Sequence, residues 1–114
     1  MKKFYLLIFM LSIIAVSFGQ TFLSEDFSSN QMPPAAWTID GLPAQWSVSN
    51  TNSAGGTKPE GKFTYTNANS TTRLISPVVD LTGYTSVTLG FSHFYDDYTG
   101  TGPKLGVATK SQGS

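Results

Sequence analysis

The stretch RLISPVVDLTGYTSVTLGFSHFYDDY, from Arg73 to Tyr98, carries the pattern that decides the fold class. From residue 85 onward, apolar and small polar residues alternate. The apolar or aromatic positions are Val87, Leu89, Phe91, His93 and Tyr95. A period of two is typical of an antiparallel strand with one buried face, so the odd-numbered side chains are predicted to lie in a core. A lone histidine on such a face is more often a hydrogen-bonded core residue than a catalyst.

The rest of the chain beyond Gln20 also favours strands over helices. No stretch keeps apolar residues at helical spacing for three turns, and threonine, serine, asparagine and glycine alternate with aromatic and β-branched residues. Strands are predicted at residues 21–27, 37–40, 45–49, 63–66, 74–75, 78–79 and 105–108. The polar segment 50–61 is predicted to be a surface loop. The pattern indicates an all-β antiparallel sandwich.

The first 19 residues have the three parts of a secretory signal peptide. Lys2 and Lys3 precede an apolar run that extends to Phe18, and Ser17 and Gly19 place small residues at a cleavage site. The run is short for a membrane span, which needs roughly 20 residues. We expect cleavage before Gln20, export to the cell surface or medium, and no membrane insertion afterwards. A retained N-terminal anchor is the alternative.

Composition limits what the mature chain of residues 20–114 can do. It keeps five basic and seven acidic residues, and it has neither a basic stripe nor basic residues interleaved with aromatic ones, so nucleic acid is not an expected partner. There are no cysteines, although small exported domains usually depend on disulfides. Stability must therefore come from a bound metal, a larger core or neighbouring parts of a longer protein.

The predicted strand at residues 105–108 begins shortly before the sequence ends. An antiparallel sandwich built from the predicted strands would need more of them to close. We therefore expect residues 20–114 to be the N-terminal part of a larger domain, with further domains of the same polypeptide beyond Ser114.

Five segments, in this order, resemble the cleaved-adhesin or choice-of-anchor-J domains, which are MAM-like modules of exported proteins in Bacteroidetes-type bacteria. The segments are LSEDF (23–27), PPAAWTIDG (33–41), QWSV (45–48), RLISPVVDLTG (73–83) and VTLGFSHFY (87–95). The resemblance covers nearly the whole mature chain, and LISPVVDL is its most specific element. It implies an antiparallel jelly-roll-like β-sandwich, incomplete in this chain, with an adhesive or carbohydrate-binding role and often structural calcium.

The chain departs from the family pattern at two places that bear on calcium. Many members have an acidic, glycine-rich loop after the Trp-Thr strand, whereas this chain has only Asp40-Gly41 followed by Leu42-Pro43. Members also often carry an aspartate before a later strand, at the place that Pro103-Lys104 occupies here. Both differences remove oxygen ligands.

Two acidic pairs are nevertheless the candidate metal ligands. Glu25 and Asp26 lie in the first predicted strand, and Asp96 and Asp97 end the alternating one. Adjacent strand residues point to opposite faces, so each pair offers one side chain to a given site. Calcium takes about six to eight oxygens, which carboxylates, carbonyls and water at strand ends can supply. The alternative is that these acids are solvated edge charges that discourage aggregation.

The remaining side chains favour a binding module over an enzyme. The sequence has one histidine, no cysteine and no nucleophile-elbow motif, so no catalytic residue is expected. Trp37 and Trp46 are predicted core anchors, and Tyr98 is the candidate ligand-binding aromatic. We expect a non-catalytic module that engages an extracellular protein or glycan. An accessory domain of a secreted protease or glycosidase, or a structural spacer, are the alternatives.

Overall fold

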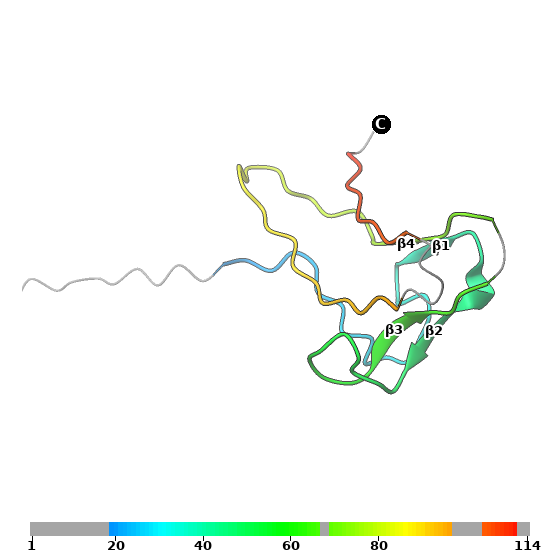
Figure 1. Cartoon of the computed structure of the whole chain (residues 1–114). Coiled ribbons are helices and arrows are strands. Elements are labelled where there is room, and N and C mark those ends of the chain that lie inside the picture. The colour runs from blue at the N-terminus through cyan, green and yellow to red at the C-terminus, as the bar shows by residue number, and fades with distance from the viewer. Residues whose placement is uncertain (1–18, 67–68, 97–103, 112–114) are drawn as a thin grey trace, which may run out of the picture.

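The computed structural model describes residues 19–66, 69–96 and 104–111. Within these ranges four short strands form two antiparallel pairs, and no α-helix is present (Figure 1). The strands are β1 (Thr38–Asp40), β2 (Trp46–Ser49), β3 (Glu60–Phe63) and β4 (Arg73–Ile75), and a single 3-10 turn, η1 (Pro43–Gln45), precedes β2. The predicted all-β class is therefore confirmed.

The sheet of β2 and β3 carries the main aromatic cluster. Trp46 is paired with Phe63, and Val48 with Gly61, so these side chains share one face of the sheet. The rings of Trp46 and Phe63 lie 5.3 Å apart at an angle of 57°. The ring of Phe27 covers Gly61 so closely that a Cβ there would lie 2.7 Å from it. Glycine at this position is what allows the segment before β1 to pack on the sheet.

The second sheet pairs β1 with β4. Ile39 lies opposite Leu74, and both are half-buried. At the end of the pair Arg73 lies opposite Asp40, and its guanidinium donates to the carboxylate at 2.6 Å. Both charged side chains are about 60% exposed (61% and 59%), so water screens the ion pair and its contribution to stability is small.

A chain of two hydrogen bonds joins the two sheets. The indole Nε1–H of Trp46 donates to Thr72 Oγ1 at 2.7 Å, and this hydroxyl donates to the carbonyl oxygen of Gly41 at 2.6 Å. Gly41 follows β1 and Thr72 precedes β4, while Trp46 opens β2. The indole therefore fixes the ends of one sheet to the first residue of the other. Figure 1 shows the two sheets side by side.

Three of the predicted strands are confirmed, with small shifts of their ends. β1 and β2 lie within the predicted segments 37–40 and 45–49, and β4 begins one residue before the predicted segment 74–75, whereas the predicted strand at 78–79 is absent. β3 begins at Glu60, three residues before the predicted start, because residue 60 closes the polar loop and brings the following residues alongside β2. The chain also turns at Gly83, where Tyr84 N–H donates to Leu81 O at 3.1 Å.

The prediction of a strand at 21–27 is wrong. This segment has no strand pairing, and it ends in a turn at Phe27, whose φ is 59°. The carboxylates of Glu25 and Asp26 accept hydrogen bonds from the backbone two residues ahead. These local bonds compete with a sheet ladder for the same N–H groups, which is why short acidic side chains favour turns.

The prediction of a buried strand at 87–95 is also wrong. Residues 85–96 lie outside every strand that the structure describes, and all of them are exposed. Leu89 is 62% and Phe91 57% exposed, and His93 is exposed rather than part of a core. The predicted strand at 105–108 is likewise absent. Alternation identifies one apolar face but not a layer to cover it, so the periodicity alone could not establish burial.

The small strands bury little apolar surface. In the described ranges no large apolar side chain is fully buried, and Pro34 is the largest side chain with under 2% exposure. Trp37 and Trp46, the predicted core anchors, are half-buried. Packing of the fold therefore rests on a thin aromatic layer around β2 and β3.

Candidate functional site

The first acidic pair, Glu25 and Asp26, belongs to a turn. Glu25 Oε1 accepts a hydrogen bond from Phe27 N–H at 2.6 Å, and Asp26 Oδ1 accepts one from Ser28 N–H at 2.9 Å. Hydrogen bonds from the Ser28 side chain and backbone lower the pKa of Asp26. The turn is closed by Asn30 N–H, which donates to Phe27 O at 3.0 Å.

The second acidic pair is described only at its first member. Asp96 is exposed at the end of the extended segment 85–96. Asp97 and the predicted ligand-binding Tyr98 lie outside the described residues. In the ranges that are described, no three histidine, cysteine, aspartate or glutamate side chains gather as a metal site would require. The calcium site therefore stays a prediction.

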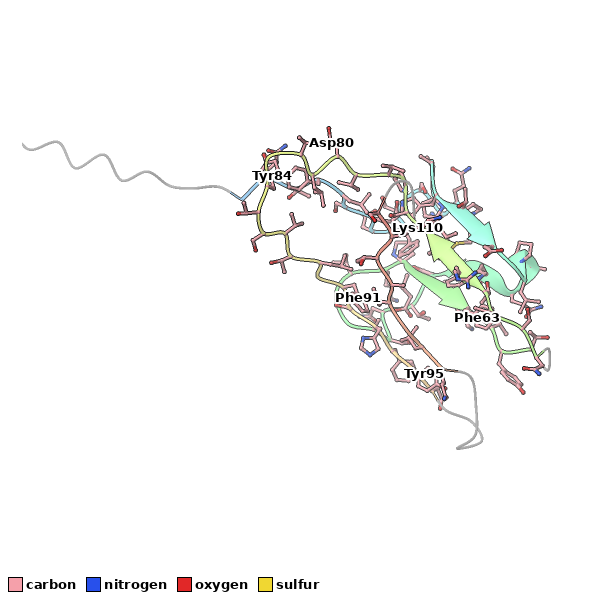
Figure 2. The ribbon with its side chains drawn as sticks, turned by 90° about the horizontal axis from the view of Figure 1, so that it is seen from above. Phe63, Asp80, Tyr84, Phe91, Tyr95 and Lys110 are labelled. Carbon is pink, nitrogen blue, oxygen red and sulfur yellow. The ribbon has the colours of Figure 1, made fainter. Side chains whose placement is uncertain are left out.

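A row of large apolar side chains is exposed along segment 85–96. This apolar row consists of Val87 (48% exposed), Leu89 (62%), Phe91 (57%), Phe94 (63%) and Tyr95 (42%). The rings of Phe91 and His93 lie 5.7 Å apart. Figure 2 labels Phe91 and Tyr95, which both lie on this segment. Large exposed apolar patches mark interaction surfaces more often than isolated exposed residues do.

Glu60 organises the polar loop between β2 and β3, a role the sequence analysis missed. Its Oε1 accepts a hydrogen bond from Ser53 N–H at 3.0 Å and another from the Thr51 hydroxyl, and its Oε2 accepts one from Ala54 N–H at 3.0 Å. The bond from Ala54, followed by those from Thr51 and Ser53, lowers the pKa of Glu60 to about 2. The clue in the sequence is one carboxylate after a serine- and glycine-rich loop.

Acidification is expected to open this loop. A lowered carboxyl pKa stabilises the folded loop above the ordinary pKa of 4.5, and that stabilisation is lost as the pH falls toward about 2. Glu60→Gln should abolish the pH dependence and weaken the loop at neutral pH, because a neutral amide is a poorer acceptor than a carboxylate. Amide exchange at Ser53 and Ala54, followed by NMR, measures the opening.

Asp80→Asn is the matched control for this prediction. Asp80 Oδ1 accepts a hydrogen bond from Thr82 N–H at 2.9 Å in a different turn, and hydrogen bonds from Thr82 lower its pKa. The substitution should leave exchange at Ser53 and Ala54 unchanged. Protection factors at these two amides, meaning exchange rates corrected for the intrinsic effect of pH, that stay constant between pH 5 and about pH 2 would contradict the role of Glu60.

A third cluster joins the segment after Gly19 to the turn at 81–84. The Tyr84 hydroxyl donates to Gln20 Oε1 at 2.5 Å. The ring of Phe22 meets the ring of Tyr84 edge-to-face, with centroids 4.7 Å apart and an interplanar angle of 81°. The sequence analysis assigned Tyr84 no such contact, because nothing in the local pattern predicts a bond across 64 residues.

No family model, curated protein or solved structure matches the chain. Within the described ranges, the structure contains no helix with the length and apolar character of a membrane span. The function is therefore argued from the exposed apolar row, the acidic turns and the chemistry of the side chains themselves.

Proposed function

We propose that the chain is an exported, non-catalytic binding module that engages an extracellular protein or a glycan. The observation that supports this most is the apolar row at 87–95, whose five large side chains are 42% to 63% exposed. A protein that leaves five large apolar side chains of one short segment in water gains free energy when a partner covers them.

The composition of the row suits both kinds of partner. Aromatic faces such as those of Phe91 and Phe94 can stack on the apolar face of a sugar ring or pack into a protein interface. Leu89 and Val87 supply aliphatic surface beside them. Apart from His93, the row from Val87 to Tyr95 contains no ionisable group that would have to be desolvated when the partner binds near neutral pH.

The surroundings of His93 favour binding over catalysis. General acid–base chemistry needs a histidine oriented by hydrogen bonds toward a nucleophile or a substrate proton. The contact identified for the His93 ring is instead an aromatic one, with Phe91. His93 therefore fits a recognition surface better than a catalytic pair.

The finer proposal for the fold is an antiparallel jelly-roll-like β-sandwich. Such a sandwich has about eight strands in two sheets, and the antiparallel pairs β1–β4 and β2–β3 are compatible with parts of its two sheets. Under this proposal calcium is held by Glu25 or Asp26 from one segment and Asp96 or Asp97 from the other. The position of Glu25 and Asp26 side by side in one exposed turn supports that assignment.

A binding experiment on the mature exported protein tests the proposed function. Glycans and extracellular proteins are screened with the unaltered protein, with Phe91→Ala and with Val78→Ala. Phe91→Ala should weaken binding roughly tenfold, because aromatic residues at the centre of an interface are the usual hot spots. Val78, which is 73% exposed but outside the apolar row, is the matched control and should leave binding unchanged.

Three results would contradict the proposal. Absence of any glycan or protein ligand would favour a structural spacer. Hydrolysis of a protein or glycan by the mature polypeptide, with no binding by residues 20–114, would favour an accessory domain of a secreted hydrolase. Equal losses from Phe91→Ala and Val78→Ala would place the binding surface elsewhere.

The same protein serves to test calcium. If the two acidic pairs share an ion, a chelator should lower the melting temperature, because carboxylates held together without a cation repel each other. Added calcium should restore it, and Glu25→Gln combined with Asp26→Asn should remove the response. A melting curve that changes with neither chelator nor calcium would remove the metal from the proposal.

A further inference from the structure

The contact between Gln20 and Tyr84 lies at the position where the signal peptide is predicted to end. Tyr84 is labelled in Figure 2 at the turn that meets the segment after Gly19. The hydroxyl of Tyr84 donates to Gln20 Oε1 at 2.5 Å, and the Phe22 ring packs edge-to-face on the Tyr84 ring. Two independent contacts therefore hold residues 20 and 22 against the 81–84 turn.

The junction before Gln20 is open to other molecules. Gly19 and Gln20 are both exposed, and no atom lies within 4 Å of the position that a Cβ on Gly19 would take. A peptidase can therefore reach the bond between these two residues. Its cleavage would convert the backbone nitrogen of Gln20 into an α-amine. The pKa of such an amine is about 8, so a useful fraction is neutral and nucleophilic near neutral pH.

We propose that Gln20 is a modification site at which the mature chain cyclises to pyroglutamate, and that Tyr84 binds the resulting lactam. The α-amine nitrogen of Gln20 attacks its own side-chain Cδ, and a bond between N and Cδ forms. The bond between Cδ and Nε2 breaks, and Nε2 leaves as ammonia after it takes a proton from the α-amine. No oxidant, reductant or other co-reactant is consumed.

The geometry at Tyr84 is compatible with the product as well as with the glutamine. Tyr84 donates to Oε1, which is the side-chain oxygen that the lactam retains, whereas the reaction expels Nε2. The hydrogen bond can therefore survive the modification. Cyclisation also removes the positive charge of the new N-terminus, and an uncharged lactam is easier to place beside the half-buried ring of Phe22.

The anchored lactam has a consequence for the mature protein. A free N-terminal segment is ordinarily the first part of a domain to fray and to be degraded. A lactam has no free α-amine for an aminopeptidase to recognise, and the bond to Tyr84 restrains the residues that follow. The contact thus protects the stretch that leads into the Glu25–Asp26 turn.

Mass spectrometry of the mature exported protein tests the modification directly. The N-terminal peptide should begin at residue 20 and be lighter by one ammonia than a peptide with free glutamine. Tyr84→Phe should keep the lactam but speed proteolytic cleavage within residues 20–24 roughly two- to tenfold, the effect expected when loss of one neutral hydrogen bond raises the population of the released segment. Gln20→Ala should keep the signal cleavage, leave a free amine and speed this proteolysis to the same extent.

Tyr65→Phe is the matched control, because Tyr65 is 59% exposed and lies away from this turn in the sequence. It should alter neither the N-terminal mass nor the proteolysis within residues 20–24. A mature chain that begins at any residue other than 20, or that keeps a free amine on Gln20, would overturn the proposal. A lactam-bearing segment that is cleaved equally fast with and without the Tyr84 hydroxyl would overturn the assigned role of Tyr84.

Discussion

Gly41→Ala is expected to lower the free energy of unfolding by about 2–4 kcal/mol, through backbone strain and a steric clash together. Gly41 has a φ of +77°, a conformation that L-residues with a side chain rarely adopt. A Cβ at this position would lie 2.6 Å from the carbonyl oxygen of Thr71. Because that oxygen belongs to the backbone just before β4, it cannot rotate away as a side chain could.

The clash would act on the junction that joins the two sheets. The carbonyl of Gly41 accepts the hydrogen bond from Thr72, which in turn accepts the indole N–H of Trp46. Displacement of residues 71–72 by the added methyl group would lengthen both bonds. We therefore expect the loss to exceed that of an ordinary glycine substitution.

Gly56→Ala separates the two contributions. Gly56 has a similar φ of +82°, but no atom lies within 4 Å of its would-be Cβ. This variant should lose only the conformational part, about 1–2 kcal/mol. Urea denaturation followed by circular dichroism measures both. Equal losses for the two variants would mean that the close approach of Thr71 has no energetic effect.

The strands that could be predicted from the sequence are those that begin or end near a proline or a glycine. The segment that becomes β1 lies between Pro34 and Gly41, and β2 follows the Gly41–Pro43 turn. In both cases a proline or glycine with restricted or unusual backbone geometry sets a boundary of the strand. The apolar residues beyond that boundary then favour an extended, half-buried segment. Such local signals act over a few residues and can be recognised without a structure.

The features that could not be predicted depend on contacts between distant residues. Periodicity marked one face of 87–95 as apolar, but whether a face is buried depends on what lies opposite it, and the described residues leave it exposed. The role of Glu60 depends on a loop that folds back over six to nine residues, and the bond from Tyr84 to Gln20 spans 64. No local pattern encodes these distances.

The candidate acidic site likewise has a local part that the sequence predicts and a long-range part that it does not predict. The turn-forming carboxylates of Glu25 and Asp26 are the residues that the sequence singled out, yet it assigned them to a strand, and their local bonds instead form a turn. Whether Asp96 meets them is a question of long-range geometry. Acidic residue pairs are therefore predictable as candidates, whereas their assembly into a cation site is not.

Trp46→Ala should destabilise the protein by about 2–4 kcal/mol, the second large effect that we expect. The ring of Trp46 is half-buried against Phe63, so truncation removes apolar contact from a fold with little buried apolar surface. It also removes the indole N–H that donates to Thr72 Oγ1 at 2.7 Å. The bond from Thr72 to Gly41 would remain, but it links the ends of β1 and β4 within one sheet and does not reach β2.

Trp46→Phe distinguishes the packing of the ring from its hydrogen bond. Phenylalanine keeps most of the contact with Phe63 but cannot donate to Thr72, so its loss should be about 1 kcal/mol. Thr72→Val removes the bond from Trp46 and also the bond to Gly41. Because both substitutions remove the bond between Trp46 and Thr72, the double variant with Trp46→Phe should lose less stability than the sum of the two single losses. Strict additivity would show that indole and hydroxyl act independently. In that case the bond between indole and hydroxyl would contribute nothing to the coupling of the two sheets.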